Sequence, residues 1–427
     1  MINDLLAFLD ASPVNFMATA TAASQLRAAG FQEVDMKSPV PSLEPGKGYF
    51  FTMNHSSLYA FRVGSGEARD GFKIIAAHTD SPCFRVKPHP EMAGEGGVVR
   101  LNTEVYGGAI LYTWFDRPLS LAGRVILRGA SPLTPVTRLL HIKQPLLVIP
   151  HLAIHFNRQV NEGNPISKQR DMIPILGIVK NELERENLLL NTVASELQVE
   201  PEEILDFDLY LYDTTPACLC GLHGEFVSSG RQDDLVMDCA GLHALTGSKP
   251  TAMTQVLALF DNEETGSGTK QGAASPFLRE VLLAVMRSRG GSATDWPAAV
   301  AASFLVSADM AHAFHPNYAD KYDPTNHPAM GGGPVIKINA AQKYVTDAES
   351  AAIFAEVCRT AGVPCQYFVN HSDVAGGSTL GNIMSSQIPL RGVDMGNPLW
   401  AMHSVRETTA AIDYEYAVKA FTQFYNI

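Results

Sequence analysis

The sequence predicts an α/β protein in which a mixed, mostly parallel sheet is flanked by helices and interrupted by an inserted, strand-rich domain. Short apolar runs of strand length alternate with amphipathic stretches of helical spacing towards both ends of the chain. Between residues 90 and 225 the pattern changes to short β-like pieces separated by glycine, proline and polar turns. We therefore expect a catalytic domain formed by residues 1–89 and 226–427, with residues 90–225 inserted into it.

Residues 4–30 have helical spacing and end at Gly30, which suits a helix C-cap, and the run 72–77 predicts a buried strand. The insert offers strand-like pieces at 98–101, 109–114, 123–127 and 207–212. The last part predicts strands at 256–260 and 302–306, a loop at 288–294, and helices at 235–245, 276–287, 349–361 and 409–425.

Composition excludes several classes of protein. The chain has 427 residues, 46% of them hydrophobic, and a formal net charge of −12, which argues against nucleic acid as a partner. No apolar run approaches the roughly 18–20 residues that span a bilayer, and the first residues lack the features of a signal peptide. None of the six cysteines forms a C-x-x-C pair. We expect a cytoplasmic protein with reduced cysteines and no membrane association.

Three apolar runs are each followed by a histidine or a carboxylate, which are side chains that can bind metal. The run 74–77 leads to His78, the run 256–260 leads to Glu263 and Glu264, and the run 304–306 leads to Asp309. In an open parallel sheet, ligands bind beyond the carboxyl ends of the strands. Taken singly, each residue is more often a helix cap, a turn residue or a core residue than a ligand. Their repeated position after buried strands favours one shared metal site.

Two further candidates lie before predicted helices, namely Asp233 and His403. With His78, Glu264 and Asp309 they make two neutral and three negative ligands, which with a bridging hydroxide balance two divalent cations. Mixed nitrogen and oxygen ligands suit two zinc ions per chain, for which Co²⁺ or Mn²⁺ can substitute.

The spacing also suggests roles for the neighbouring acids. Asp80 lies two residues after His78, on the same side of an extended segment, where it can accept the second ring N–H and fix the tautomer. Adjacent side chains of an extended segment point to opposite sides, so Glu264 can bind metal while Glu263 acts as general base. The local sequence alone also allows the reverse assignment.

Several motifs then resemble the aspartyl aminopeptidases, a family of dinuclear zinc metallopeptidases. They are HTDSPC at 78–83, RQDD at 231–234, FDNEETGS at 260–267, SADMAHAFHPNY at 307–318 and AMHSVRE at 401–407. The resemblance runs from FLDASP at 8–13 to the last helix. It implies a zinc aminopeptidase-like fold, the same five ligands, Asp233 as the residue that bridges the metals, and Glu263 as the base.

The resemblance also implies partners and substrate contacts. The insert would be a dimerisation domain, and dimers would build a tetrahedral dodecamer. Lys337 and Tyr344 would bind the acidic side chain of the substrate, and the loop containing Gly377 would lie near its backbone. A histidine of the insert would reach the site of a neighbouring subunit, and we favour His151 over His155.

The sequence therefore predicts a metalloaminopeptidase that releases N-terminal Asp or Glu from peptides, through a hydroxide held between two zinc ions. The alternatives are a broad-specificity dinuclear zinc aminopeptidase, an acyl-amino-acid deacylase, and a structural shell without activity. Asp234 is a departure, because relatives often carry Asn at this position, and its carboxylate would alter metal affinity.

Overall fold

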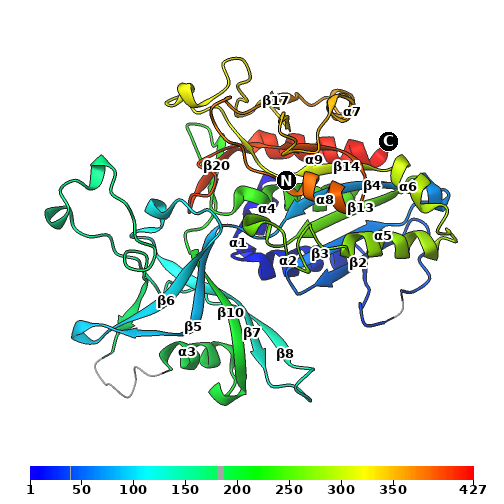
Figure 1. Cartoon of the computed structure of the whole chain (residues 1–427). Coiled ribbons are helices and arrows are strands. Elements are labelled where there is room, and N and C mark those ends of the chain that lie inside the picture. Colours follow the sequence, from blue (N-terminus) through cyan, green and yellow to red (C-terminus); the bar gives the residue numbers. More distant parts are fainter. Residues whose placement is uncertain (39, 180–186) are drawn as a thin grey trace. The chain divides into compact units, whose positions relative to one another are not determined.

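The computed structural model describes residues 1–38, 40–179 and 187–427. It divides into two compact units. The first comprises Met1–Asp80, Ala217–Met402 and Glu407–Ile427, and the second comprises Ser81–Pro216 and His403–Arg406. The mixed α/β class expected from sequence is confirmed (Figure 1). The unit boundaries fall after residues 80 and 216, where the sequence suggested 89 and 225, and residues 403–406 join the second unit.

The first unit is built on a nine-stranded sheet. Its strands, in spatial order, are β1 (Gln32–Glu33), β2 (Gly48–Met53), β3 (Ser57–Arg62), β13 (Thr254–Phe260), β4 (Phe72–His78), β14 (Phe304–Ala308), β18 (Arg391–Gly396), β16 (Val335–Lys337) and β17 (Gln366–Phe368). The four central strands, from β13 to β18, run parallel to one another, whereas β3 and β16 flank them antiparallel. A smaller sheet of the same unit joins β11 (Cys218–Cys220), β12 (Phe226–Ser229), β20 (Glu407–Ala410), β19 (Pro398–Trp400) and β15 (Ala311–His312).

Helices cover both faces of the large sheet. They are α1 (Ile2–Ala11), α2 (Asn15–Ala28), α4 (Gln232–Gly247), α5 (Phe277–Ser288), α6 (Trp296–Ala302), α7 (Ala348–Thr360), α8 (Leu380–Gln387) and α9 (Ala411–Asn426). Because strand side chains alternate, Ile75 of β4 packs with α4 and α9, while its neighbour Ile74 packs with α5 and α6 on the other face. The predicted helical stretch 4–30 is split into α1 and α2 around Pro13, whose ring does not fit a helix interior.

The second unit is a six-stranded antiparallel sheet. Its spatial order is β8 (Val136–His141), β7 (Leu119–Leu127), β10 (Ile204–Asp213), β5 (Cys83–Ala93), β6 (Val98–Tyr106) and β9 (Ile175–Ile178). Helix α3 (Leu188–Leu197) contributes Leu189, Val193 and Leu197 to its core. The strand expected at 109–114 is wrong. Leu111–Trp114 forms a 3₁₀ turn, because the backbone amide and the hydroxyl of Thr113 both donate hydrogen bonds to the carbonyl of Ile110.

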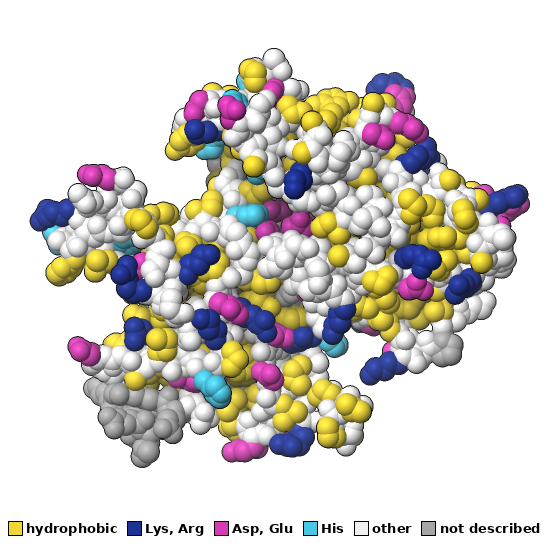
Figure 2. Space-filling view, viewed as in Figure 1, with side chains coloured by type: hydrophobic (Ala, Val, Ile, Leu, Met, Phe, Trp, Pro, Cys, Tyr) yellow, Lys and Arg dark blue, Asp and Glu magenta, His cyan; other side chains and the backbone are white. Residues whose placement is uncertain are grey.

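The surface is chemically mixed. Figure 2 shows basic, acidic and apolar side chains interspersed over the face in view. In the second unit, Leu152, Ile154 and Phe156 are large apolar side chains that stay exposed, Phe156 by 81%. Among the described residues, no helix has both the length and the apolar character needed to cross a bilayer.

Candidate metal centre

Three neighbouring parallel strands place His78, Glu264 and Asp309, three of the predicted ligands, at one edge of the large sheet. Strands β13, β4 and β14 lie side by side, with Phe260 of β13 level with His78 of β4. His78 is the last residue of β4, and Asp309 follows the end of β14. The strand order brings together side chains that lie far apart in the sequence.

Among the described residues of the first unit, two overlapping groups of ligand atoms form there. One contains His78, Asp233, Asp234 and Asp309, and the other contains His78, Glu263 and Glu264; within each group, one ligand atom per residue lies within 4.8 Å of all the others. His78 Nε2 lies 3.4 Å from Asp233 Oδ1. His78, Asp233, Asp234 and Asp309 are buried, so these donors face one another rather than bulk water.

The start of α4 supplies two acids instead of one. Asp233 and Asp234 have non-helical backbone angles, and the backbone amide of Asp233 donates to Glu407 Oε2 at 3.1 Å. Asp234 Oδ2 accepts from the backbone amide of His78 at 3.1 Å. The sequence assigned the ligand role to Asp233 alone. Asp234 joins the cluster because the irregular first turn directs both side chains towards β4.

The paired glutamates do not lie in an extended segment, so that expectation is wrong. Glu263–Thr265 forms a 3₁₀ turn after β13, bounded by the left-handed residues Asn262 and Gly266. Successive side chains of such a turn are about 120° apart rather than opposite. Both glutamates therefore have an oxygen near His78, and strand alternation does not separate a ligand from a base.

Asp80 holds this turn against His78. Its two carboxylate oxygens accept from the backbone amides of Glu263 (3.1 Å) and Glu264 (3.2 Å). His78 Nδ1 lies 3.1 Å from the backbone oxygen of Asp80 and 3.5 Å from its Oδ1. A proton on Nδ1 would leave Nε2, which faces Asp233, as the metal-binding nitrogen. The contacts to the two amides were not anticipated from the sequence.

The donor set fits a divalent cation. Burial raises the pKa of Asp309, and the negative charge of Asp233 adds to the rise, while Lys337 acts in the opposite direction. Burial likewise raises the pKa of Glu263 to about 9. Asp234 Oδ1 is buried and has no hydrogen-bond partner within the described residues. Clustered carboxylates of this kind need a positive charge, and with an imidazole they form a donor set that zinc accepts.

Lys337, Tyr344 and Gly377, three of the predicted substrate residues, lie in the same unit. Lys337, the last residue of β16, is buried, and its Nζ is 3.4 Å from Asp309 Oδ1 and 5.7 Å from the centre of the Tyr344 ring. Burial lowers the pKa of Lys337, but its carboxylate neighbours, Asp309 first among them, outweigh that effect and raise it. Gly377 lies on an exposed loop before α8.

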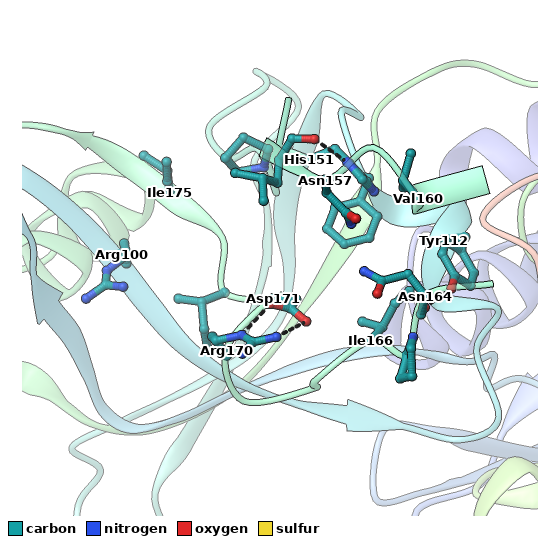
Figure 3. A pocket seen from close by; sticks show the side chains of 15 residues that line it. Arg100, Tyr112, His151, Asn157, Val160, Asn164, Ile166, Arg170, Asp171 and Ile175 are labelled. Atoms are coloured by element: carbon teal, nitrogen blue, oxygen red, sulfur yellow. Dashed lines mark hydrogen bonds and ion pairs between the residues drawn. The ribbon is translucent and has the colours of Figure 1, made fainter. Parts of the chain in front are cut away.

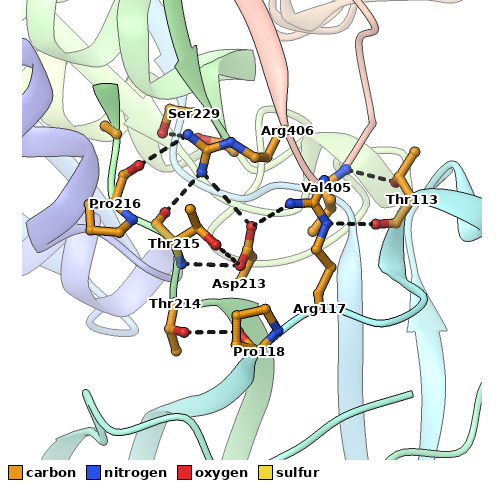
Figure 4. A network of polar contacts seen from close by, with 12 residues as sticks. Thr113, Arg117, Pro118, Asp213, Thr214, Thr215, Pro216, Ser229, Val405 and Arg406 are labelled. Carbon is orange, nitrogen blue, oxygen red and sulfur yellow. Dashed lines mark hydrogen bonds and ion pairs between the residues drawn. The ribbon is translucent and has the colours of Figure 1, made fainter. Parts of the chain in front are cut away.

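His403 belongs to the second unit, and its contacts there are well defined. Its Nδ1 is 3.2 Å from the backbone oxygen of Gly108. Val405 is buried in the core of the insert, and the Arg406 guanidinium donates to the carbonyls of Thr215 and Pro216 (Figure 4). The assignment of His403 as a metal ligand stays a prediction from sequence.

His151 also lies in the second unit. Its ring packs edge-on against Phe115 at 4.5 Å, and its Nδ1 is 2.8 Å from the backbone oxygen of Leu152. It lines a cavity of about 440 Å³, together with Arg100 and the ion pair of Arg170 with Asp171 (Figure 3). The role of His151 at a neighbouring subunit, and the choice between it and His155, remain predictions.

The chain is similar to known proteins over its whole length. Residues 8–425 match the model of the family described as aminopeptidase I zinc metalloprotease (M18). A protein named probable M18 family aminopeptidase 2, from Clostridium acetobutylicum, is 51% identical over 424 residues, which cover 99% of this chain and 98% of that protein.

The chain is also similar to solved structures over nearly its whole length. A chain of the Ape4 and Nbr1 complex is 38% identical, with a TM-score of 0.96 over 99% of this chain and 85% of that chain. The S. cerevesiae mApe1 dodecamer is 25% identical, with a TM-score of 0.86 over 99% of this chain and 96% of that chain.

Proposed function

The chain belongs to the aminopeptidase I zinc metalloprotease family (M18), and from this premise we propose that it releases N-terminal acidic residues from peptides. The buried cluster of His78, Asp233 and Asp309, with the Glu263–Thr265 turn beside it, is the observation that supports the peptidase activity. The proposed ligands of two zinc ions are His78, Asp233, Glu264, Asp309 and His403, with Co²⁺ or Mn²⁺ as substitutes.

Zinc, when bound, lowers the pKa of a coordinated water and polarises a carbonyl group. The protein's own contribution to catalysis is to hold the ligands and to move the proton. Glu263 takes the proton from the attacking water and delivers it to the leaving amine. Asp80 supports this step by fixing the backbone amides of Glu263 and Glu264, so that the base is held beside His78. The assignment of Glu263 rather than Glu264 as the base rests on the family motif.

Acidic specificity is assigned to Lys337. A lysine this deeply buried is one of few groups able to attract a substrate carboxylate without competition from bulk water. Tyr344 stands against it and completes the proposed contact to the side chain. The loop with Gly377 would lie along the substrate backbone.

We further propose a dodecamer built from dimers of the insert. The mApe1 structure of S. cerevesiae is a dodecamer, and the exposed apolar side chains of Leu152, Ile154 and Phe156 are of the kind that oligomer interfaces bury. His151 would then reach a neighbouring site.

A broad-specificity aminopeptidase is the second candidate, and one contact favours it. Lys337 Nζ lies 3.4 Å from Asp309 Oδ1. If this ion pair persists in the working enzyme, Lys337 supports a metal ligand rather than binding substrate. Both candidates require the same zinc chemistry but differ in the rates on acidic and neutral substrates.

The test compares the wild-type enzyme with Glu263→Gln and the neighbouring Glu264→Gln. Zinc content and release of Asp, Glu, Ala and Leu from their p-nitroanilides are measured for each protein. We expect Glu263→Gln to keep its zinc and lose turnover by several orders of magnitude, and Glu264→Gln to lose zinc as well. Near-normal turnover in Glu263→Gln would exclude Glu263 as the base. Equal wild-type rates on Asp and Leu substrates would exclude the acidic specificity while leaving the zinc aminopeptidase in place.

A further inference from the structure

One buried acid near the proposed substrate pocket has no role in the chemistry described so far. Asp394 lies in β18, is fully buried, and pairs in register with Ser307 of the neighbouring strand β14. Asp309, a proposed ligand, lies two residues beyond Ser307. The strand pairing therefore places Asp394 beside the strand that leads to Asp309.

Asp394 joins two loops that are distant in the sequence. Its Oδ2 accepts from the backbone amide of Val345 at 2.5 Å, and its Oδ1 accepts from the hydroxyl of Thr379 at 2.6 Å. The backbone amide of Asp394 also donates to the hydroxyl of Thr346 at 2.8 Å. Val345 directly follows Tyr344, and Thr379 lies two residues after Gly377. The two loops proposed to contact substrate are thus tied to the same residue.

Thr379, at the start of α8, uses its hydroxyl for the hydrogen bond to Asp394 and not for the usual helix cap. Thr379 is the N-cap of α8, but its side chain makes no capping hydrogen bond. N-cap threonines ordinarily accept from an amide of the first helical turn. Here the hydroxyl donates to Asp394 instead, so the orientation of the helix start depends on the carboxylate.

The backbone at this point packs closely on Asp394. A Cβ added to Gly381 would lie 2.5 Å from Asp394 Oδ2 and 2.8 Å from Oδ1, closer than real contacts allow. Glycine at this position therefore lets the first turn of α8 approach the carboxylate. The negative charge beside a helix N-terminus is also electrostatically favourable.

Asp394 also belongs to the electrostatic surroundings of Lys337. Burial raises the pKa of Asp394, while the neighbouring Ser307 side chain, the hydrogen bonds from Thr379 and Val345 and the positive charge of Lys337 act in the opposite direction. Lys337 in turn lies against the ring of Tyr344. The residue that anchors both loops therefore shares its neighbourhood with the lysine assigned to specificity.

We propose that Asp394 is a positioning residue that holds the Tyr344–Thr346 segment and the Gly377–Thr379 loop in fixed places around Lys337, and so shapes the pocket for the N-terminal side chain of the substrate. The inference rests on the proposed function, because that function assigns the two loops to substrate binding. It goes beyond it by naming the residue that sets their geometry.

The decisive variants are Thr379→Val and Thr379→Ser. Valine has the shape of threonine but removes the hydroxyl, and it leaves the charge of Asp394 beside Lys337 intact. Serine keeps the hydroxyl and serves as the matched control. Loss of one hydrogen bond to a buried carboxylate predicts an increase in KM of about tenfold for the preferred p-nitroanilide in Thr379→Val. We expect kcat to change less than about threefold and zinc content to stay unchanged, with Thr379→Ser close to wild type.

Asp394→Asn extends the test. Asparagine can accept from only one of the two donors, so KM should rise at least as much as in Thr379→Val. Unchanged KM in Thr379→Val, or equal KM values in Thr379→Val and Thr379→Ser, would overturn the proposal. If Asp394→Asn fails to fold, the two threonine variants still decide. If the wild-type enzyme shows no preference for acidic residues, only the proposed specificity is refuted. The effect of Thr379→Val on KM is then measured with the neutral p-nitroanilide that the wild-type enzyme cleaves best, and it still tests the role of Asp394.

Discussion

Lys337→Met tests the proposed basis of specificity most directly. Methionine keeps an unbranched apolar side chain in a buried position and removes the ammonium group. In the proposed complex that ammonium makes a charge-assisted contact with the substrate carboxylate. A sheltered contact of this kind contributes about 1.5–3 kcal/mol.

That free energy corresponds to a loss of about tenfold to a hundredfold in kcat/KM for an Asp substrate. An Ala substrate makes no such contact, so its kcat/KM should change less than about threefold. The ratio of the two values is the quantity to measure, because a general loss of active enzyme cancels from it. Lys343→Met, which removes an exposed lysine six residues along the chain, is the matched control and should leave the ratio unchanged.

Zinc content must be measured in the same preparations. The Lys337 ammonium holds down the pKa of Asp309, which burial raises. Its removal makes Asp309 harder to ionise, which would weaken metal binding. An unchanged Asp-to-Ala ratio in a zinc-loaded Lys337→Met enzyme would refute the specificity argument. A parallel loss of zinc and of both activities would show instead that Lys337 mainly supports Asp309.

Three further predictions follow from the first unit. Gly381→Ala should lower the thermal midpoint and destabilise the protein by about 1–3 kcal/mol, because its Cβ would press on the Asp394 carboxylate; an unchanged midpoint would contradict the close approach. Lys73→Met should stabilise the protein at pH 7, because burial lowers the pKa of Lys73 from 10.5 to about 8 and disfavours its charge in the folded state. The gain, at most about 3 kcal/mol, should shrink as pH rises from about 8 and vanish near pH 10.5, which denaturant titrations at several pH values would check. Removal of zinc by a chelator should abolish peptidase activity and lower the thermal midpoint, because the clustered carboxylates lose their counter-charge. Added zinc should restore both the activity and the midpoint. An unchanged thermal midpoint after zinc removal would contradict this account.

The large sheet explains why residues that lie far apart in the sequence could be predicted to lie together. Buried runs ending in His78, in the Glu263–Glu264 pair and in Asp309 are visible as text, and the carboxyl ends of parallel strands meet at one edge. The sequences of the three runs do not predict the order in which β13, β4 and β14 pair. These side chains lie together because all three strands are parallel, so every order among neighbours brings their carboxyl ends to the same edge.

Local backbone geometry explains what the sequence could not show. Asp233 and Asp234 are chemically identical, and only the irregular first turn of α4 places both near His78. The paired glutamates were expected in an extended segment, whereas Asn262 and Gly266 adopt left-handed conformations and close a 3₁₀ turn. Such turns depend on single backbone angles, which hydrophobic periodicity does not report.

The path of the chain near His403 was equally hidden. Residues 403–406 follow a stretch of the first unit and precede β20, so their sequence position assigns them to the catalytic part. Val405 nevertheless packs in the core of the insert, and Arg406 binds the carbonyls of Thr215 and Pro216, where the insert ends. The burial of Val405 and the two hydrogen bonds of Arg406 therefore assign residues 403–406 to the second unit, although they are continuous in sequence with the first.

Asp80 connects the two halves of the proposed chemistry. Its carboxylate accepts both glutamate amides, and its backbone oxygen and Oδ1 lie beside the ring nitrogen of His78 that faces away from Asp233. A sequence argument assigned it only the tautomer of His78. Because the same residue also fixes the turn that carries the proposed base, a change at Asp80 should disturb metal binding and proton transfer together. Variants of Glu263 or His78 alone should affect one of these more than the other, so Asp80 is the residue through which the positions of ligand and base are coupled.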